Sequence, residues 1–291
     1  NAATNVTIHT GLDHYPVINT TRTLKNLVIE AGASIEVNGG TLQIAGSISN
    51  AGIFNVSTGT IEMIGTDLQT IPENAFTNHV IKNLVISNDV VIVGTDTLTG
   101  TLSFGASNKI LVTGDSLILK STATRTARIA DMTNQGLLSG NVISGKVIIE
   151  RYISAARGWR LLSVPIGSND APTINAAWQE GLTTASANPN LYPGYGVKIS
   201  GGSTDNGFDQ SNTNASFIKT YNNINNAFVA LPGNPGTNIP INTYPAYFLY
   251  IRGNRSINLM QGMNSAITDA TLRIHGQVKT GNQVEPVDAA N

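Results

Sequence analysis

The stretch Val147 to Ile166, VIIERYISAARGWRLLSVPI, marks a change in the character of the chain. Before it, short apolar runs alternate with Gly, Asn and Ser, and aromatic residues are few. From this stretch onward come both tryptophans and most of the tyrosines and prolines. A chain of 291 residues is long enough for two domains that each bury a core. We therefore predict one domain over residues 1–146 and a second over residues 147–291, with residues 147–166 as the junction.

The composition favours strands and excludes several classes of site. Charged residues make up 12% of the chain, whereas Asn, Gly and Thr are abundant, a mixture that favours strands joined by tight turns. The 17 basic residues are balanced by 18 acidic ones and are not gathered into a basic stripe, which argues against nucleic-acid binding. The absence of cysteine excludes disulfides, thiolate catalysis and cysteine-ligated zinc. No apolar run approaches the roughly 20 residues that span a membrane, and we expect the chain to be a processed or excised part of a larger protein.

An internal duplication organises the first half of the chain. LKNLVI at Leu24–Ile29 is echoed by IKNLVI at Ile81–Ile86, 57 residues later. Each copy is followed by strand-length runs that recur about every seven to ten residues and end in Gly, Asn, Ser or Asp. This spacing predicts a β-solenoid, similar to a parallel β-helix, for residues 1–146, with an antiparallel sandwich as the alternative. Asn26 and Asn83 either hydrogen-bond along the stack of coils or, on the simpler interpretation, only favour turns.

The second half predicts an antiparallel architecture. One short helix is expected over Ile174–Glu180, with Thr173 as its N-cap and Gly181 as its stop. The spacing of the apolar runs, with Pro, Asn and Gly between them, predicts a β-sandwich of jelly-roll type. The expected strands, after the one at 158–166, are 194–200, 216–221, 227–231, 246–253, 256–260 and 271–278.

The motif ERYISAARGWRLLSVPI resembles one found in very large secreted surface proteins of Bacteroidetes. The matching residues are Glu150 to Ile153, Trp159, Arg160, Leu162 and Pro165, and the segments 21–52, 188–199 and 244–259 are similar to the same family. The resemblance implies export by the type IX secretion system, and display at the outer-membrane cell surface or release as an adhesin or matrix component. It also implies O-glycosylation at Asp-Ser/Thr-apolar triplets, which makes Thr97 and Ser116 candidate attachment sites.

Arginine and aromatic side chains gather around the junction. We predict that they lock the two domains together through ion pairs and ring stacking; an anionic glycan or lipopolysaccharide is the alternative ligand. This junction cluster consists of Arg151, Tyr152, Arg157, Trp159 and Arg160.

Two further candidate sites lie in the second half. Aromatic residues of the predicted sandwich could stack on sugar rings or fill its core: Trp178, Tyr192, Tyr195, Tyr221 and Tyr244. The loop 201–214 carries oxygen donors that could bind Ca²⁺, although without EF-hand spacing: Asp205, Asn206, Asp209 and Asn212. No other cofactor is expected.

No constellation in the sequence identifies a reaction. The acidic residues of the predicted solenoid are dispersed rather than paired, and the four histidines show no metal-binding spacing. We therefore expect a non-catalytic structural or adhesive module of a large extracellular bacterial protein, acting as a stiff spacer that contacts neighbouring domains, further copies or surface glycans and that could form fibres. A carbohydrate-binding module is the alternative, and a polysaccharide lyase or hydrolase ranks behind both.

Overall fold

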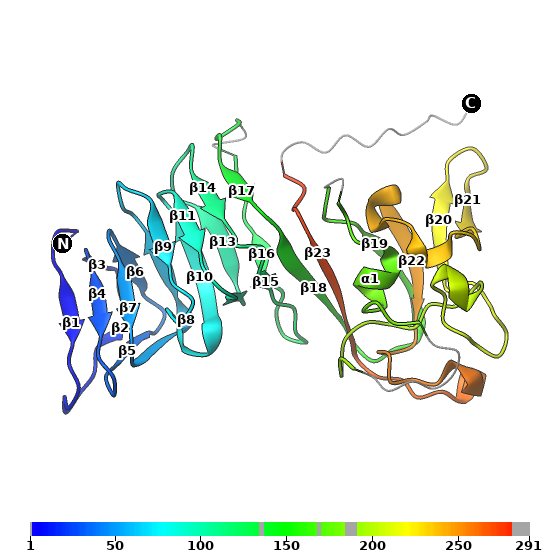
Figure 1. Ribbon diagram of the computed structural model, residues 1–291, viewed down its shortest axis with the longest axis horizontal. Helices are drawn as coiled ribbons and strands as arrows, with labels where there is room; N and C mark the ends of the chain where they lie inside the picture. Colours follow the sequence, from blue (N-terminus) through cyan, green and yellow to red (C-terminus); the bar gives the residue numbers. More distant parts are fainter. Residues whose placement is uncertain (1, 134–136, 168–169, 184–190, 281–291) are drawn as a thin grey trace. The chain divides into compact units, whose positions relative to one another are not determined.

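The computed structural model describes residues 2–133, 137–167, 170–183 and 191–280 (Figure 1). The fold is all-β, with 40% strand and 9% helix. The chain divides into two compact units, Asn1–Ile148 (unit 1) and Ile149–Asn291 (unit 2), and each is described by itself.

Unit 1 is a β-solenoid of about 5 turns, which confirms the prediction from the repeat. Its short strands pair in parallel with the strands of the next coil, in three runs that include β1-β4-β7, β2-β5-β8-β10-β12-β15 and β9-β11-β14-β17. The strands are β1 (Val6–Ile8), β2 (Val17–Ile18), β3 (Arg22–Leu24), β4 (Leu27–Ile29), β5 (Ser34–Val37), β6 (Thr41–Ile44), β7 (Ile48–Asn50), β8 (Ile53–Met63), β9 (Gln69–Ile71), β10 (Val80–Ile86), β11 (Val90–Ile92), β12 (Thr97–Leu98), β13 (Thr101–Phe104), β14 (Ile110–Val112), β15 (Leu117–Leu119), β16 (Arg128–Ile129) and β17 (Val142–Ser144), with a 3-10 turn η1 (Thr77–His79).

Apolar residues at alternate positions form columns inside the solenoid. Ile61 pairs with Leu42 on one side and with Leu84 on the other, and Leu84 pairs with Leu102. None of the four is more than 1% exposed. Because each short strand has only one buried side, no coil can hide its apolar residues alone, and stacking supplies the missing contacts.

Unit 2 contains an antiparallel four-stranded sheet in the order β19-β22-β20-β21. Helix α1 begins as predicted, since the Thr173 side chain accepts a hydrogen bond from Ala176 N at 3.0 Å. The predicted strand at 256–260 is wrong: Asn258 caps a 3-10 helix there instead, by accepting from Met260 N. The predicted strand at 194–200 forms only isolated bridges. The elements are β18 (Val147–Ile153), whose first two residues belong to unit 1, β19 (Gly158–Ser163), α1 (Ile174–Trp178), η2 (Thr204–Asn206), β20 (Ile218–Asn222), β21 (Ala227–Ala230), η3 (Gly236–Asn238), η4 (Ile241–Thr243), β22 (Ala246–Ile251), η5 (Leu259–Asn264) and β23 (Ala270–Gly276).

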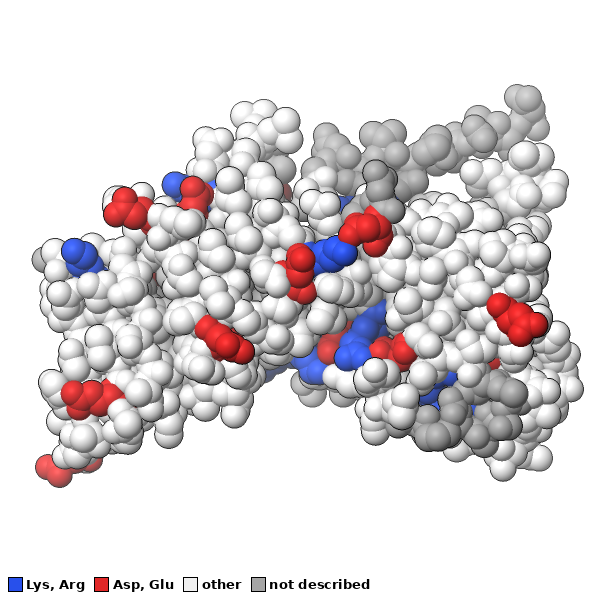
Figure 2. Space-filling view, in the orientation of Figure 1, with Lys and Arg blue, Asp and Glu red and all other residues white. Residues whose placement is uncertain are grey.

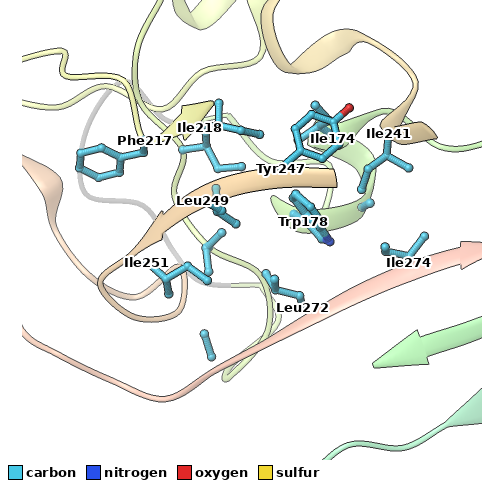
Figure 3. Close-up of a cluster of buried hydrophobic side chains, with 14 of the residues drawn as sticks. Ile174, Trp178, Phe217, Ile218, Ile241, Tyr247, Leu249, Ile251, Leu272 and Ile274 are labelled. Atoms are coloured by element: carbon cyan, nitrogen blue, oxygen red, sulfur yellow. The ribbon is translucent and has the colours of Figure 1, made fainter. Parts of the chain in front are cut away.

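The core of unit 2 lies on one side of this sheet (Figure 3). Tyr247, Leu249 and Ile251 of β22 point into it and meet Trp178 of α1 and Leu272 of β23. A helix and a strand therefore supply part of the opposing layer, and a jelly-roll-like sandwich of two complete sheets is not confirmed.

Candidate functional site

The side of the four-stranded sheet that faces away from this core carries an aromatic surface. Along β22, Tyr247, Leu249 and Ile251 are at most 2% exposed, whereas Phe248 and Tyr250 between them are only half-buried. Because successive strand residues point to opposite faces, the cross-strand pairing places their neighbours on the same side. We call this surface the outer face; it comprises Trp159, Leu161, Lys219, Tyr221, Phe228, Phe248 and Tyr250.

The rings of the outer face stack on one another. Phe248 lies between Trp159 and Phe228, with ring centroids 4.7 Å apart on both sides and interplanar angles of 18° and 29°. Tyr250 is tilted against Trp159 at 5.3 Å, and Tyr221 meets Phe228 edge-on at 5.3 Å. A pyranose ring needs a free aromatic face to stack on. In this stack both faces of Phe248 and one face each of Trp159 and Phe228 are covered by a neighbouring ring, which leaves fewer free ring faces for a sugar.

Two cations border these rings. The Lys219 ammonium lies 5.0 Å from the centre of the Trp159 ring. The Arg252 guanidinium lies 5.7 Å from the Tyr250 ring and 5.0 Å from the Phe217 ring, and it donates to Gly262 O at 2.7 Å. Rings hold such cations by their quadrupole, at about 0.5–1 kcal/mol for an exposed pair. The outer face therefore combines apolar contact area with positive charge.

Much of the outer face is accessible to solvent. Leu161 is 68% exposed, Tyr221 51% and Phe228 44%. Met260 and Met263 of η5, the helix whose carbonyl Arg252 binds, are also exposed. Contiguous apolar surface of this kind marks interaction sites in soluble proteins. By contrast, charge is sparse on the side of the molecule in Figure 2, where neither sign forms an extended patch.

The sequence did not predict this surface. Of the five candidate glycan-binding aromatics only Tyr221 lies on it, and Trp159 was assigned to the junction cluster instead. The signal was present in AYFLYI, where Tyr, Leu and Ile alternate with Ala, Phe and Tyr. A strand that is apolar on both faces and lies within a single sheet must present one apolar face to something else.

The other candidate aromatics do not form a common site. Trp178 is 2% exposed and meets Tyr247 edge-on in the core, so of the two roles predicted for it this residue fills the core and is not placed to bind a glycan. Tyr244 is half-buried against Tyr247. The Arg273 guanidinium lies 4.1 Å from the Tyr195 ring and 5.4 Å from the exposed Tyr192 ring. These rings therefore serve mainly as packing groups and as supports for Arg273.

Asp209 corrects the predicted calcium loop. Its carboxylate is fully buried and accepts from both Nη atoms of Arg255, at 2.7 and 3.1 Å, and from Ile199 N at 2.9 Å. A guanidinium at this position disfavours a metal cation. Asp205 and Asn212 are exposed, and Asn206 donates to Gly233 O. Among the residues that the structure describes, no three His, Cys, Asp or Glu side chains gather closely enough to hold a metal ion.

The described contacts of the junction cluster lie within unit 2. Arg157 binds Ser265 O, and Arg160 donates to Trp159 O at 3.1 Å. A hydrogen bond from the Tyr152 hydroxyl to Asp269 raises the pKa of that tyrosine. Arg151 is exposed. The prediction that these residues lock two domains together stays a prediction.

The two candidate glycosylation residues lie in unit 1. Thr97 is half-buried, and the Ser116 hydroxyl donates to Gly94 O. Asp96, the first residue of the Thr97 triplet, is fully buried. In folded unit 1 the aspartate of this triplet is therefore hidden from solvent.

The chain matches no family model, no curated protein and no solved structure. None of the helices formed by the described residues has the length and apolar character needed to cross a membrane.

Proposed function

We propose that this chain is a non-catalytic structural and adhesive module of a larger bacterial surface or matrix protein, outside the cell. In this proposal unit 1 is a stiff spacer, and unit 2 makes the adhesive contact through its outer face. The observation that carries the proposal is the aromatic stack Trp159–Phe248–Phe228, which stays partly exposed although it has the composition of a core.

The solenoid supports the spacer role. Each coil pairs in parallel with the next through backbone hydrogen bonds, such as Ala45 N to Leu24 O at 3.0 Å and Ile64 N to Ile44 O at 2.9 Å. An array of such coils resists bending because every coil is fixed to two neighbours. Nothing in this role requires a reacting group.

The ring geometry favours a protein partner for the outer face over a neutral glycan. Since both faces of Phe248 and one face each of Trp159 and Phe228 are covered by a neighbouring ring, few ring faces are left for a sugar to stack on. Side chains of a protein can interdigitate with ring edges, Leu161 and the nearby methionines. Lys219 adds a preference for a partner that offers a carboxylate near the rings.

Adhesion of beads that carry the purified chain tests the proposal. We expect the beads to bind intact Bacteroidetes cells and to lose binding in a Leu161→Glu/Tyr221→Glu variant, which places charge on the outer face at two exposed positions. Leu138→Glu is the matched control, because Leu138 is 90% exposed on unit 1. Pretreating the cells with protease should abolish binding, and periodate should not. The proposal would be overturned if binding survived the double substitution, or if periodate abolished binding and protease did not. Cleavage of a cell-surface polysaccharide by the chain would also overturn it.

A further inference from the structure

Strand β21 is an unprotected edge of the unit 2 sheet. Among the described residues it pairs with β20 alone, and Figure 1 shows it as the outermost strand, in yellow. Its sequence, AFVA, contains no charge and no proline, and every residue in it is at least partly exposed. Natural proteins usually protect such edges with lysine, proline or a bulge, because a bare edge accepts another strand.

The free hydrogen-bonding groups of β21 follow from its pairing with β20. Leu231 N donates to Ile218 O at 3.2 Å, so this pair is hydrogen-bonded. Because hydrogen-bonded and open pairs alternate in an antiparallel ladder, Phe228 and Ala230 occupy open pairs with β20. Their N–H and C=O groups point toward the free edge, where the described chain supplies no strand partner.

We infer that β21 pairs with β21 of a second copy of this chain across a two-fold axis, joining the two sheets into one of eight strands. In an antiparallel pair, opposite residues share a face, and we place Phe228 of one copy opposite Phe228 of the second copy because this register brings the two aromatic stacks together. The stack Trp159–Phe248–Phe228 would then continue without interruption into the corresponding stack of the second copy. This contact uses the edge of β21 and leaves the outer face open, so the inference goes beyond the proposed function and does not depend on it.

Charge selects this edge contact over a face-to-face dimer. Stacking two outer faces directly would bring their two Lys219 ammonium groups toward each other over the same rings. In the edge-to-edge arrangement, three strand spacings separate the two Lys219 strands, about 14 Å at roughly 4.8 Å per strand. That separation exceeds the Debye length of about 8 Å at physiological salt. Strand β21 itself contributes no charge to the contact.

Sedimentation of the full chain tests the inference when residue 228 is replaced by a residue of either charge. We expect the native chain to show a monomer–dimer equilibrium by sedimentation at up to about 100 µM, a concentration that reveals any micromolar association. Phe228→Lys and Phe228→Glu should each weaken self-association at least about tenfold, through like charges directly opposite each other. An equimolar mixture of the two should dimerise again. Tyr221→Lys, one strand inward on the same face, is the matched control and should retain the dimer.

A backbone variant tests the strand pairing without altering the rings. Ala230→Pro removes an N–H that points to the free edge and should give a monomer with an unchanged circular dichroism spectrum. If the variants at position 228 do not fold, the oligomeric state of Ala230→Pro still tests whether β21 forms the dimer contact. A native chain that stays monomeric at about 100 µM, or a mixture that does not dimerise, would overturn the inference. If the chain is monomeric but the beads still adhere to cells, the inference about the dimer fails and the proposed function stands. If the chain dimerises but the beads do not adhere, the proposed function fails and the inference stands.

Discussion

Asn26 and Asn83 make the same contact in the two copies of the sequence repeat. The Asn26 side-chain oxygen accepts from Ser47 N at 2.8 Å, and that of Asn83 accepts from Thr101 N at 3.0 Å, in each case in a later coil. A glycine precedes each donor, Gly46 and Gly100, and a Cβ there would lie 2.1 and 2.4 Å from the asparagine oxygen. The asparagines therefore join coils and need the adjacent glycine, which corrects the simpler interpretation as turn residues.

Asn83→Ala should lower the free energy of unfolding by about 1–2 kcal/mol, because it leaves the Thr101 N–H without its acceptor in a partly buried place. Urea denaturation followed by far-UV circular dichroism measures the change. Asn74→Ala is the matched control at an exposed asparagine and should shift stability by less than about 0.5 kcal/mol. Equal effects in the two variants would contradict the coil-joining role.

The β-solenoid could be predicted from the sequence, but the sheet in which each copy of the repeat lies could not. Period-2 apolar pairs closed by glycine and asparagine specify short strands that cannot bury themselves alone, and stacking is the remaining solution. Leu27 and Leu84 occupy the same position in the two copies but lie in different sheets, Leu27 in β4 beside β1 and Leu84 in β10 beside β8. Periodicity gives the coil, whereas the sheet that a given apolar pair joins depends on where the chain turns.

We expect a second relationship within the solenoid, between Asp96 and His79, to make the stability of the fold depend on pH. Val80 of one coil pairs with Thr97 of the next. His79 and Asp96 are the residues just before them in the sequence. Asp96 is fully buried, and neither of its carboxylate oxygens has a hydrogen-bond partner among the residues that the structure describes. Burial raises the pKa of this carboxyl to about 7, against a weaker lowering by the charge of His79.

Because its pKa is raised in the folded state, Asp96 binds its proton more tightly there than in the unfolded state. A rise in pH therefore lowers the free energy of unfolding. The unfolding free energy should be largest below about pH 4, fall as the pH rises toward 7, and stay low above it, by up to about 4 kcal/mol. Asp96→Asn should match the native chain near about pH 4 and exceed its stability near about pH 8. Denaturation across this range is the measurement, with exposed Asp67→Asn as control. An unchanged pH profile in Asp96→Asn would refute the assignment.

Removing one partner of the buried pair Asp209–Arg255 should strongly destabilise unit 2. Asp209→Asn leaves the guanidinium, which is 1% exposed, without a compensating charge, at a cost of about 3–5 kcal/mol. Asp205→Asn, in the same loop but exposed, should cost less than about 0.5 kcal/mol. Urea unfolding followed by tryptophan fluorescence compares the two variants, because both tryptophans lie in unit 2, and EGTA should leave the unfolding curve of the native chain unchanged. A destabilising effect of EGTA would restore the calcium interpretation.

The same loop shows where sequence reasoning fails. Asp, Asn and Gly close together are typical of solvated or calcium-binding loops, and nothing local distinguishes Asp209 from Asp205. The partner of Asp209 is 46 residues away, and the two meet only once unit 2 has folded. Long-range pairing of single charges leaves no local pattern in one sequence.

The two tryptophans should respond differently to truncation. Trp178→Ala removes a core side chain and should cost about 3–5 kcal/mol. Trp159→Ala removes an outer-face ring and should cost less, about 0.5–1.5 kcal/mol for each aromatic contact that it breaks. Because Phe248 is its stacked neighbour, a double-mutant cycle with Phe248→Ala should give a coupling of about 0.5–1.5 kcal/mol. Measured by urea unfolding, zero coupling would place the importance of Trp159 elsewhere, such as the predicted interdomain junction.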